Sequence, residues 1–397
     1  GPAPRACCSR FTIAAIRSDR IALVCILTRS NNAIHPRTYM TRDDLAHARL
    51  MNQQIAHPTS KEPSQVVAGL GAMQAQDYAG ALWAIGLRLP NAAEMSIEQA
   101  IADGAIIRTW PMRGTLHFVA AADVRWMLQL LTPRILARRA RRRQQLDLDD
   151  ATLARSRDLF IQALQGNRLL TRAALLDLLE AAGISTAAQR GYHILSHLAL
   201  TGLICLGPRA GKQDTFALLQ EWCPRAQEMD RDEALAELAE RYFTGHGPAT
   251  LHDFVWWSGL SVADARAGLA RVSTQLERRA LDDQTYWMSQ ATAAAVKTSP
   301  SVYLLPSFDE YIIGYRDRSA VLNPMHAQKI TPGSNGVFRP IVVIDGHIVG
   351  TWKRTLRKNT VEIVPSPFAA LSQVEERAFT VAAERYARFL GKSVKQS

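Results

Sequence analysis

The sequence is poor in cysteine and in long apolar runs, and both shortages narrow the class of protein. Its 397 residues hold five cysteines and no C-x-x-C pair, which excludes a disulfide-stapled scaffold and a cysteine-based zinc module. No apolar run approaches about 18 residues, so no transmembrane helix is expected. No G-x-S-x-G motif occurs, and neither Cys205 nor Cys223 stands in a setting that favours a reactive thiolate. We therefore expect a cytoplasmic protein with reduced cysteines.

Positive charge exceeds negative charge. The sequence has 47 lysines and arginines against 36 aspartates and glutamates, a formal net charge of +11. Such a surplus favours an anionic partner such as nucleic acid or a membrane surface. Residues 1–39 contain six arginines and one acid, so they supply +5 of the +11. We predict that residues 1–39 are a disordered or non-native leader with Met40 as the natural start, and they carry no argument for DNA binding.

One plan of helices and strands occurs three times after Gln54. The clearest copy has a helix capped by Thr171, a tight turn, a second helix, a strand, a basic loop and a second strand. Its predicted segments are Thr171–Ala182, Gly183–Ser185, a helix from Thr186 that ends before Gly202, Leu203–Leu206, Gly207–Gln213 and Thr215–Leu219. This order is typical of the winged helix-turn-helix, whose second helix can enter a major groove while the loop reaches the DNA backbone.

Two less regular copies flank the middle one. The first has predicted helices over Ser64–Gln76 and Ser96–Asp103 and predicted strands over Ile106–Trp110 and Leu116–Val119. The third has a helix over Pro248–Trp257, a helix that ends at Val272, and strands around Leu281 and over Tyr286–Met288.

The pattern changes to β after Ser301. The predicted strands are Val302–Leu305, Tyr311–Tyr315, Ile341–Ile344, Ile348–Trp352 and Thr360–Val364. Asp345-Gly346 is a strong hairpin signal, and a final amphipathic helix is expected over Ser372–Leu390.

These patterns predict an α+β fold in which three tandem winged-helix units form an arc and precede a β-rich domain. The predicted divisions are a leader over 1–39, the first unit over 40–145, the second over 146–225, the third over 226–298, and the β-rich domain with its C-terminal helix over 299–397.

Two sequence patterns resemble ligand-binding motifs but do not meet their requirements. Gly207–Lys212 resembles a phosphate loop, but it has three residues rather than four between its glycines, and Gln213 replaces the serine or threonine that would bind magnesium. His193 and His197 have the i,i+4 spacing of paired metal ligands, but no third ligand is evident and a structural role is the better interpretation. We expect no metal and no organic cofactor.

Basic residues cluster at two places. Six arginines crowd the end of a helix predicted over Ala121–Gln145, namely Arg134, Arg138, Arg139, Arg141, Arg142 and Arg143. A solvated helix end and a phosphate-contacting patch are both open interpretations of this cluster. In the middle unit, the residues that we predict to contact the DNA backbone are Arg190, His193, Arg209 and Lys212.

Two further clusters are unusual in composition. Arg108–His117 places two arginines, a tryptophan and a histidine in a predicted strand-turn-strand, and a structural reason alone would not favour so many polar groups near apolar strands. Gln74 and Gln76 place two neutral amides at the end of a predicted apolar helix, where composition alone makes them surface groups.

Taken in order, several segments resemble the bacterial winged-helix DNA glycosylases of the AlkZ type. They are Gln74-Ala75-Gln76, Arg113 through His117, Gly247 through Gly259, Leu304 through Arg318, and Val343 through Lys353. The resemblance covers roughly residues 45–390 and excludes the leader.

The resemblance implies three tandem winged helices and a β-rich, barrel-like C-terminal domain that form a concave, C-shaped DNA-binding surface. It also implies an enzyme that removes N-alkylated purines and unhooks interstrand crosslinks. No lysine is placed by motif to form a Schiff base, so we expect a monofunctional glycosylase without a lyase step. Gln74 and Gln76 match the family's Gln-apolar-Gln motif and would be the catalytic residues, whereas Asp77 is one position too late for the acid of the Gln-apolar-Asp branch. Further DNA contacts are predicted at Arg113, His117, His347, Lys353 and Arg354. We also hypothesise that the Asp345-Gly346 turn with His347 probes the duplex.

The expected partner is double-stranded DNA that contains alkylated purines, bound by a monomer without an obligate protein partner or a membrane. One alternative is a non-catalytic winged-helix regulator, which would dimerise on a palindrome with a large specificity ratio. Another is a protein-interaction scaffold, which would show no DNA affinity at moderate salt.

Overall fold

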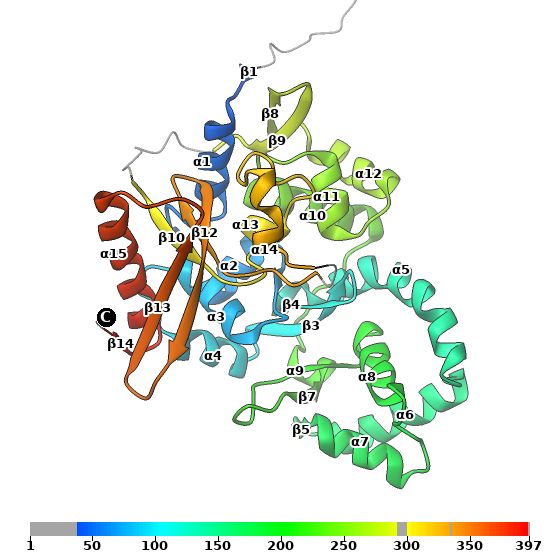
Figure 1. Cartoon of the computed structure of the whole chain (residues 1–397). Helices are drawn as coiled ribbons and strands as arrows, with labels where there is room; N and C mark the ends of the chain where they lie inside the picture. The colour runs from blue at the N-terminus through cyan, green and yellow to red at the C-terminus, as the bar shows by residue number, and fades with distance from the viewer. Residues whose placement is uncertain (1–37, 292–299, 334–335, 396–397) are drawn as a thin grey trace, which may run out of the picture. The chain divides into compact units, whose positions relative to one another are not determined.

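The computed structural model describes residues 38–291, 300–333 and 336–395, so the leader predicted over 1–39 lies almost wholly outside the described residues. The described residues belong to one compact unit of mixed helices and strands (Figure 1). Within it, β1 (Thr38–Tyr39) pairs in parallel with β8 (Leu276–Leu281). No helix in the described part of the chain has the length and apolar character needed to cross a membrane.

The first segment differs from its prediction at the two glutamines. Its elements are α1 (Arg42–Asn52), α2 (Pro63–Gly69), β2 (Met73–Gln74), α3 (Tyr78–Leu87), α4 (Glu94–Ala102), β3 (Ile106–Met112) and β4 (Thr115–Ala120). The helix predicted over Ser64–Gln76 is wrong in its second half, because the chain leaves the helix at Gly69 and Gly71 takes a left-handed conformation (φ 74°). Gln74 therefore lies on a short strand, and Gln76 lies in the bend that follows it.

The middle segment follows its prediction closely. Its elements are α5 (Val124–Gln145), α6 (Asp150–Leu164), β5 (Leu170–Thr171), α7 (Arg172–Ala181), α8 (Arg190–Leu200), β6 (Ile204–Leu206) and β7 (Thr215–Leu218). The predicted cap is confirmed, because Thr171 Oγ1 accepts the Ala174 N–H at 3.3 Å. The second helix begins at Arg190 rather than Thr186, since Ala188 and Gln189 both take positive φ.

The third segment has the predicted order of two helices and two strands. Its elements are α9 (Leu219–Trp222), α10 (Arg231–Gly245), α11 (Leu251–Ser258), α12 (Val262–Val272), β8 and β9 (Gln284–Ser289). Thr250 and Asp253 form a capping box at the start of α11, and Gly259 ends that helix in a left-handed conformation (φ 73°).

The C-terminal segment forms one five-stranded sheet, in the order β10-β11-β12-β13-β14. Its elements are β10 (Val302–Leu305), α13 (Glu310–Ile313), α14 (Ala327–Ile330), β11 (Ile341–Ile344), β12 (His347–Leu356), β13 (Thr360–Pro367), α15 (Gln373–Phe389) and β14 (Ser393–Val394). The Asp345-Gly346 hairpin is confirmed, with positive φ at both residues as a type I′ turn requires. The strand predicted over Tyr311–Tyr315 is wrong, because Asp309 caps a helical turn there and accepts the Tyr311 N–H at 2.9 Å.

Pairing and packing join segments that are far apart in the sequence. A six-stranded sheet, β2-β4-β3-β6-β7-β5, connects the first segment to the middle one through Arg108 and Leu206. One apolar core contains side chains of the first segment and of the C-terminal sheet together. Trp83 illustrates this, because its indole N–H donates to the Leu304 carbonyl at 2.7 Å. The C-terminal sheet thus packs directly beside the strand that carries Gln74.

Candidate active site

The two glutamines lie on and just after the short strand β2, and neither is buried. β2 pairs antiparallel with β4, with Gln74 opposite His117. Met73 and Ala75 point into the core, at 1% and 0% exposure, while Gln74 is half-buried and Gln76 is exposed. Successive side chains of a strand point to opposite faces, so Gln74 points away from the core that Met73 enters. Neither glutamine is therefore sealed in the interior.

Backbone hydrogen bonds fix the position of this glutamine pair. Ala75 N–H donates to the Leu116 carbonyl at 2.8 Å, and the buried Arg108 donates through Nε to the Ala75 carbonyl at 3.1 Å. Gln76 Oε1 accepts from Leu116 N–H at 3.4 Å. The segment after the short β2 strand is thus held to β4 as well.

Arg113 fixes the orientation of the Gln74 carboxamide. Its Nη2 donates to Gln74 Oε1 at 3.2 Å, and its Nη1 donates to the Trp257 carbonyl. Arg113 and Gly114 form the two-residue turn between β3 and β4, both with positive φ (53° and 78°). A left-handed conformation is unfavourable for arginine and persists where surrounding contacts fix it. The turn therefore aims a buried guanidinium at Gln74.

Glu310 holds the backbone of Gln74. Its Oε1 accepts the Gln74 N–H at 2.9 Å, and its Oε2 accepts the Trp257 indole N–H, also at 2.9 Å. His246 Nε2 lies 3.3 Å from the same Oε2. Burial opposes ionisation of Glu310, but the hydrogen bond from His246 and the charge of Arg113 outweigh it and hold the pKa of Glu310 below its ordinary value. Glu310 is therefore an anion, although it is only 1% exposed.

His117 completes the cluster as a neutral ring. Its Nδ1 lies 2.9 Å from the Thr115 carbonyl oxygen and so must carry the proton and donate it. Its Nε2 is then the acceptor for Arg113 Nη2, at 3.3 Å. Burial, followed by the repulsion of Arg113, lowers the pKa of His117 to about 3. The cluster behind Gln74 thus contains one cation, Arg113, and one anion, Glu310.

This depressed pKa predicts a pH-dependent stability. Unfolded histidine titrates near ~6.5, so at pH 5 the unfolded chain binds a proton that native His117 does not. The contribution of His117 to the unfolding free energy is therefore retained above about pH 6.5, and it is lost as the pH falls toward the pKa of His117 in the folded protein. Going from pH 7 to pH 5 should cost about 2 kcal/mol through this residue. Urea unfolding at both pH values should show that His117→Gln, which keeps a donor and an acceptor, loses less stability on acidification. An equal loss in both proteins would contradict the prediction.

The structure brings together four of the predicted site residues, Gln74, Gln76, Arg113 and His117. His117 is buried in this cluster and Arg113 is partly buried, and the two side chains contact each other. Arg209 lies at its edge, because Asp214 Oδ1 accepts from both Arg209 and Arg108 at 2.9 Å.

The remaining predicted DNA contacts lie on other elements. Lys212 and Lys353 are exposed. Arg190 is occupied by backbone carbonyls, among them that of Asp147 at 3.0 Å, and Arg354 donates to the Tyr386 hydroxyl. His193 is half-buried on α8.

The Asp345-Gly346 turn does not project as a probe, and that hypothesis is wrong. Gly346 is buried against Ala46 of α1, and its carbonyl accepts the Tyr311 hydroxyl at 2.6 Å. His347 Nε2 lies 3.0 Å from an Asp43 carboxylate oxygen. The tight turn is thus a packing contact between the C-terminal sheet and α1.

Sequence reasoning missed Glu310 and Trp257. The signal for Glu310 is its place in a mostly apolar stretch, Leu304–Tyr315, where two adjacent acids require buried partners. No signal in the sequence singles out Trp257, because its part in the site depends on a contact with Glu310 across 53 residues. In the described residues, no group of three or more histidines, cysteines, aspartates or glutamates could hold a metal ion.

Comparisons with known proteins agree with this geometry. A family model described as "DNA glycosylase AlkZ-like" matches residues 67–389. A relative from Streptomyces sahachiroi, "Interstrand DNA cross-link repair glycosylase", is 26% identical over an alignment of 364 positions that covers 87% of this chain and 95% of the relative. The solved structure of "Streptomyces sahachiroi DNA glycosylase AlkZ" matches with a TM-score of 0.74 at 24% identity, over 90% of this chain and 100% of that one, which shows a shared fold. Because the family model spans most of the sequence, the chain belongs to the AlkZ-like DNA glycosylase family.

Proposed function

We propose that the protein is a monofunctional DNA glycosylase that hydrolyses the N-glycosidic bond of cationic N-alkylated purines and unhooks interstrand crosslinks carried by such bases. The carrying observation is that two neutral carboxamides, the half-buried Gln74 and the exposed Gln76, both lie beside β4 with no carboxylate between them in the chain. The printed name of the Streptomyces relative, which refers to crosslink repair, supports the second part of the proposal.

Two amides suffice when the leaving group is already charged. Most glycoside hydrolases use one carboxyl group to protonate the leaving group and a second to assist attack. An N7- or N3-alkylated purine is a cation and departs without an acid. The remaining tasks are to position a water and to stabilise the positive charge that develops on the sugar. Oriented carboxamide dipoles of Gln74 and Gln76 perform both.

Arg113 and Glu310 act as positioning residues in this scheme. A carbonyl oxygen has two lone pairs, so Gln74 Oε1 can accept from Arg113 and keep one lone pair for the attacking water. Arg113 alone would place a positive charge close to the sugar, on which positive charge develops during the reaction. The anionic Glu310 beneath the same residue offsets that charge, so the cluster is close to neutral toward the sugar.

We further propose that the three helix–helix–strand–strand segments are winged helices that bind double-stranded DNA, with the divisions 40–145, 146–225 and 226–298. The order α7-α8-β6-β7 and the order α11-α12-β8-β9 support this. Lys212 and Lys353 are the exposed predicted contacts. The protein would act as a monomer, without a cofactor.

Asp77 is expected to support folding rather than chemistry. Its Oδ1 accepts the Gly80 N–H at 3.1 Å as the N-cap of α3. Asparagine caps helices about as well as aspartate, whereas alanine costs ~1 kcal/mol. Asp77→Asn should therefore keep both stability and excision rate, and Asp77→Ala should lower only the unfolding free energy. Thermal melts and single-turnover excision assays measure the two quantities. A large loss of excision rate in Asp77→Asn would instead make this carboxylate part of the chemistry.

A panel of defined lesions tests the proposed function. Duplexes that carry 7-methylguanine or 3-methyladenine should lose their modified base to the purified protein, whereas duplexes with the neutral bases 8-oxoguanine or hypoxanthine should not. Release of neutral bases at the same rate would contradict the charge-based mechanism. Tight binding without release of any base would favour the non-catalytic DNA-binding protein.

A further inference from the structure

Helix α5 carries its arginines on two faces that differ in their partners. Arg139 donates to Ser196 Oγ at 3.0 Å and to the Gly114 carbonyl at 3.3 Å, Arg142 donates to Gln189 Oε1 at 3.2 Å, and Arg143 pairs with Asp150 at 3.6 Å. Three other arginines are exposed, and in the described structure their guanidinium groups contact no carboxylate. These three are Arg134, Arg138 and Arg141, which we call the α5 stripe.

The spacing of the α5 stripe puts its members in one row. Residues at i, i+4 and i+7 lie on the same side of an α-helix, here over about 10 Å of its length. Like charges in such a row repel each other and destabilise an isolated helix. The row therefore costs stability without an anionic partner, and its length matches the spacing of two or three phosphates along one DNA strand.

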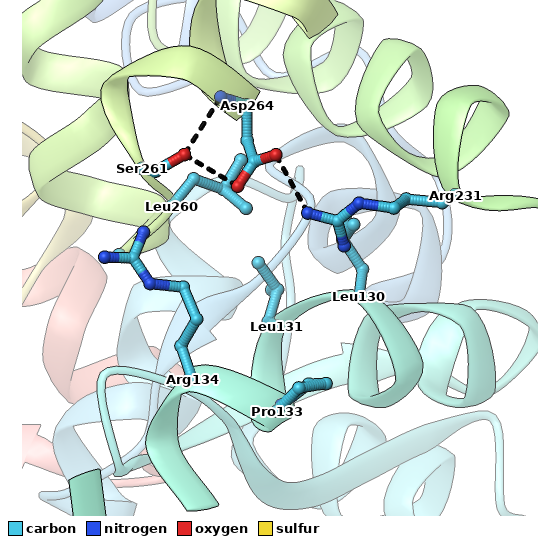
Figure 2. A pocket seen from close by; sticks show the side chains of 9 residues that line it. Leu130, Leu131, Pro133, Arg134, Arg231, Leu260, Ser261 and Asp264 are labelled. Carbon is cyan, nitrogen blue, oxygen red and sulfur yellow. Dashed lines mark hydrogen bonds and ion pairs between the residues drawn. The ribbon is translucent and has the colours of Figure 1, made fainter. Parts of the chain in front are cut away.

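A cavity of about 230 Å³ lies at the N-terminal end of this row, between α5 and the start of α12 (Figure 2). Leu130, Leu131 and Leu260 form its apolar wall. Arg134 rises from α5 along one side of the cavity, and Arg231 lies on the other side (Figure 2).

The cavity has an excess of positive charge. Its one carboxylate, Asp264, is already satisfied, because Oδ1 accepts from Arg231 at 2.8 Å and Oδ2 accepts from Ser261 Oγ at 2.7 Å. Two guanidinium groups therefore face a single carboxylate, and Arg134 keeps its donors free for a phosphodiester oxygen.

The cavity and the row both adjoin the active-site cluster. Gly259 lines the cavity, and a side chain built there would approach Arg113 Cγ to 3.5 Å. Arg139, the neighbour of Arg138 on α5, donates to the carbonyl of Gly114 in the same turn as Arg113. A strand bound along α5 would thus lead to the turn that holds Gln74.

We propose that the α5 stripe and this cavity bind consecutive phosphates of one DNA strand, with Arg134 contacting the phosphate at the cavity. This proposal rests on the proposed function, because it describes how the glycosylase site binds the DNA backbone. Phosphate contacts release counterions, so each one lost should reduce the salt slope of binding by about 0.9.

The test measures binding of full-length protein to an unmodified duplex at 50–200 mM salt. The variant Arg134→Ala/Arg138→Ala/Arg141→Ala should reduce the slope by up to about 2.7 and weaken binding roughly 10- to 100-fold at the lowest salt. The variant with lysine at the same three positions should keep most of the slope. The charge-matched control, Arg377→Ala/Arg388→Ala/Lys395→Ala, removes exposed cations of α15 and of the segment after it and should change the slope little.

Single-turnover excision of 7-methylguanine separates this proposal from the proposed function. At saturating protein, the alanine variant should keep the wild-type rate while its half-saturating concentration rises. An unchanged salt slope, or an equal loss in the control, overturns the phosphate site even if the wild type excises bases. A reduced slope in a protein that excises nothing overturns the glycosylase assignment and leaves the phosphate site standing.

Discussion

Replacing Gln74 by alanine is expected to lower the single-turnover rate of 7-methylguanine release about 10²- to 10³-fold, while affinity for the duplex changes little. The expected decrease in rate is the usual cost of removing one preorganised polar group that stabilises a transition state. Gln74 Oε1 is fixed by Arg113 at 3.2 Å, so no reorganisation is needed when charge develops on the sugar. Alanine removes this dipole and leaves β2 intact.

The companion variants of this prediction separate chemistry from folding. Gln76→Ala should also lower the rate, and the double variant should be little worse than Gln74→Ala, because groups that act on one water are not additive. Gln99→Ala removes an exposed carboxamide from α4 and serves as the control. A double variant that releases 7-methylguanine at the wild-type rate would discard the catalytic roles of both glutamines.

The variant Arg88→Met is expected to lower the unfolding free energy by roughly 3–5 kcal/mol, the usual cost when one partner of a buried ion pair is removed. Arg88 and Asp309 are both 0% exposed in their side chains and form a two-point pair at 2.8 and 2.9 Å. The other three N–H groups of the guanidinium donate to Gln53 and to the Ala84 carbonyl. Methionine fills similar space but leaves the Asp309 carboxylate buried without its counter-charge.

Chemical denaturation measures this loss of unfolding free energy. Two further variants test whether the loss comes from the buried ion pair. Arg88→Met/Asp309→Asn removes both charges and keeps a cap for α13, so it should regain more than half of the lost stability. Arg42→Met breaks an ion pair with Asp282 that is more than half exposed, and it should barely change the midpoint. A loss in Arg88→Met no larger than that in Arg42→Met would contradict the assignment. Excision should fall in Arg88→Met too, since Asp309 precedes Glu310.

The sequence predicted those elements that depend on neighbouring residues. The cap at Thr171 and the turn at Asp345-Gly346 have local chemical causes, a side-chain acceptor and a two-residue positive-φ turn, and both are confirmed. The segment Met73–Gln76 was wrongly predicted as helix. The strand that begins it is stabilised by pairing with β4, about 40 residues later, and this pairing leaves no local signal in the sequence. The helical turn at Glu310–Ile313 was missed because its apolar residues also suit a strand.

The glutamine motif of the site was found by resemblance, and its supporting groups were not found at all. Glu310 is 236 residues from Gln74, and Asp309 is 221 residues from Arg88. Such contacts are set by how the C-terminal sheet packs on the first segment, which no periodicity within one segment reveals. Arg113 was predicted to contact DNA, but the sequence carries no information that its turn points inward to Gln74.

The hydrogen bond from Gln74 to Glu310 also has a consequence for biosynthesis. A nascent chain that has emerged from the ribosome only as far as α12 already contains both glutamines, but it lacks the carboxylate that fixes one of them. We therefore expect fragments that end before residue 310 to remove no bases from the genome, because the proposed catalytic residue Gln74 lacks its contact with Glu310 in them. Expression of such fragments in cells is a simple way to see this safeguard.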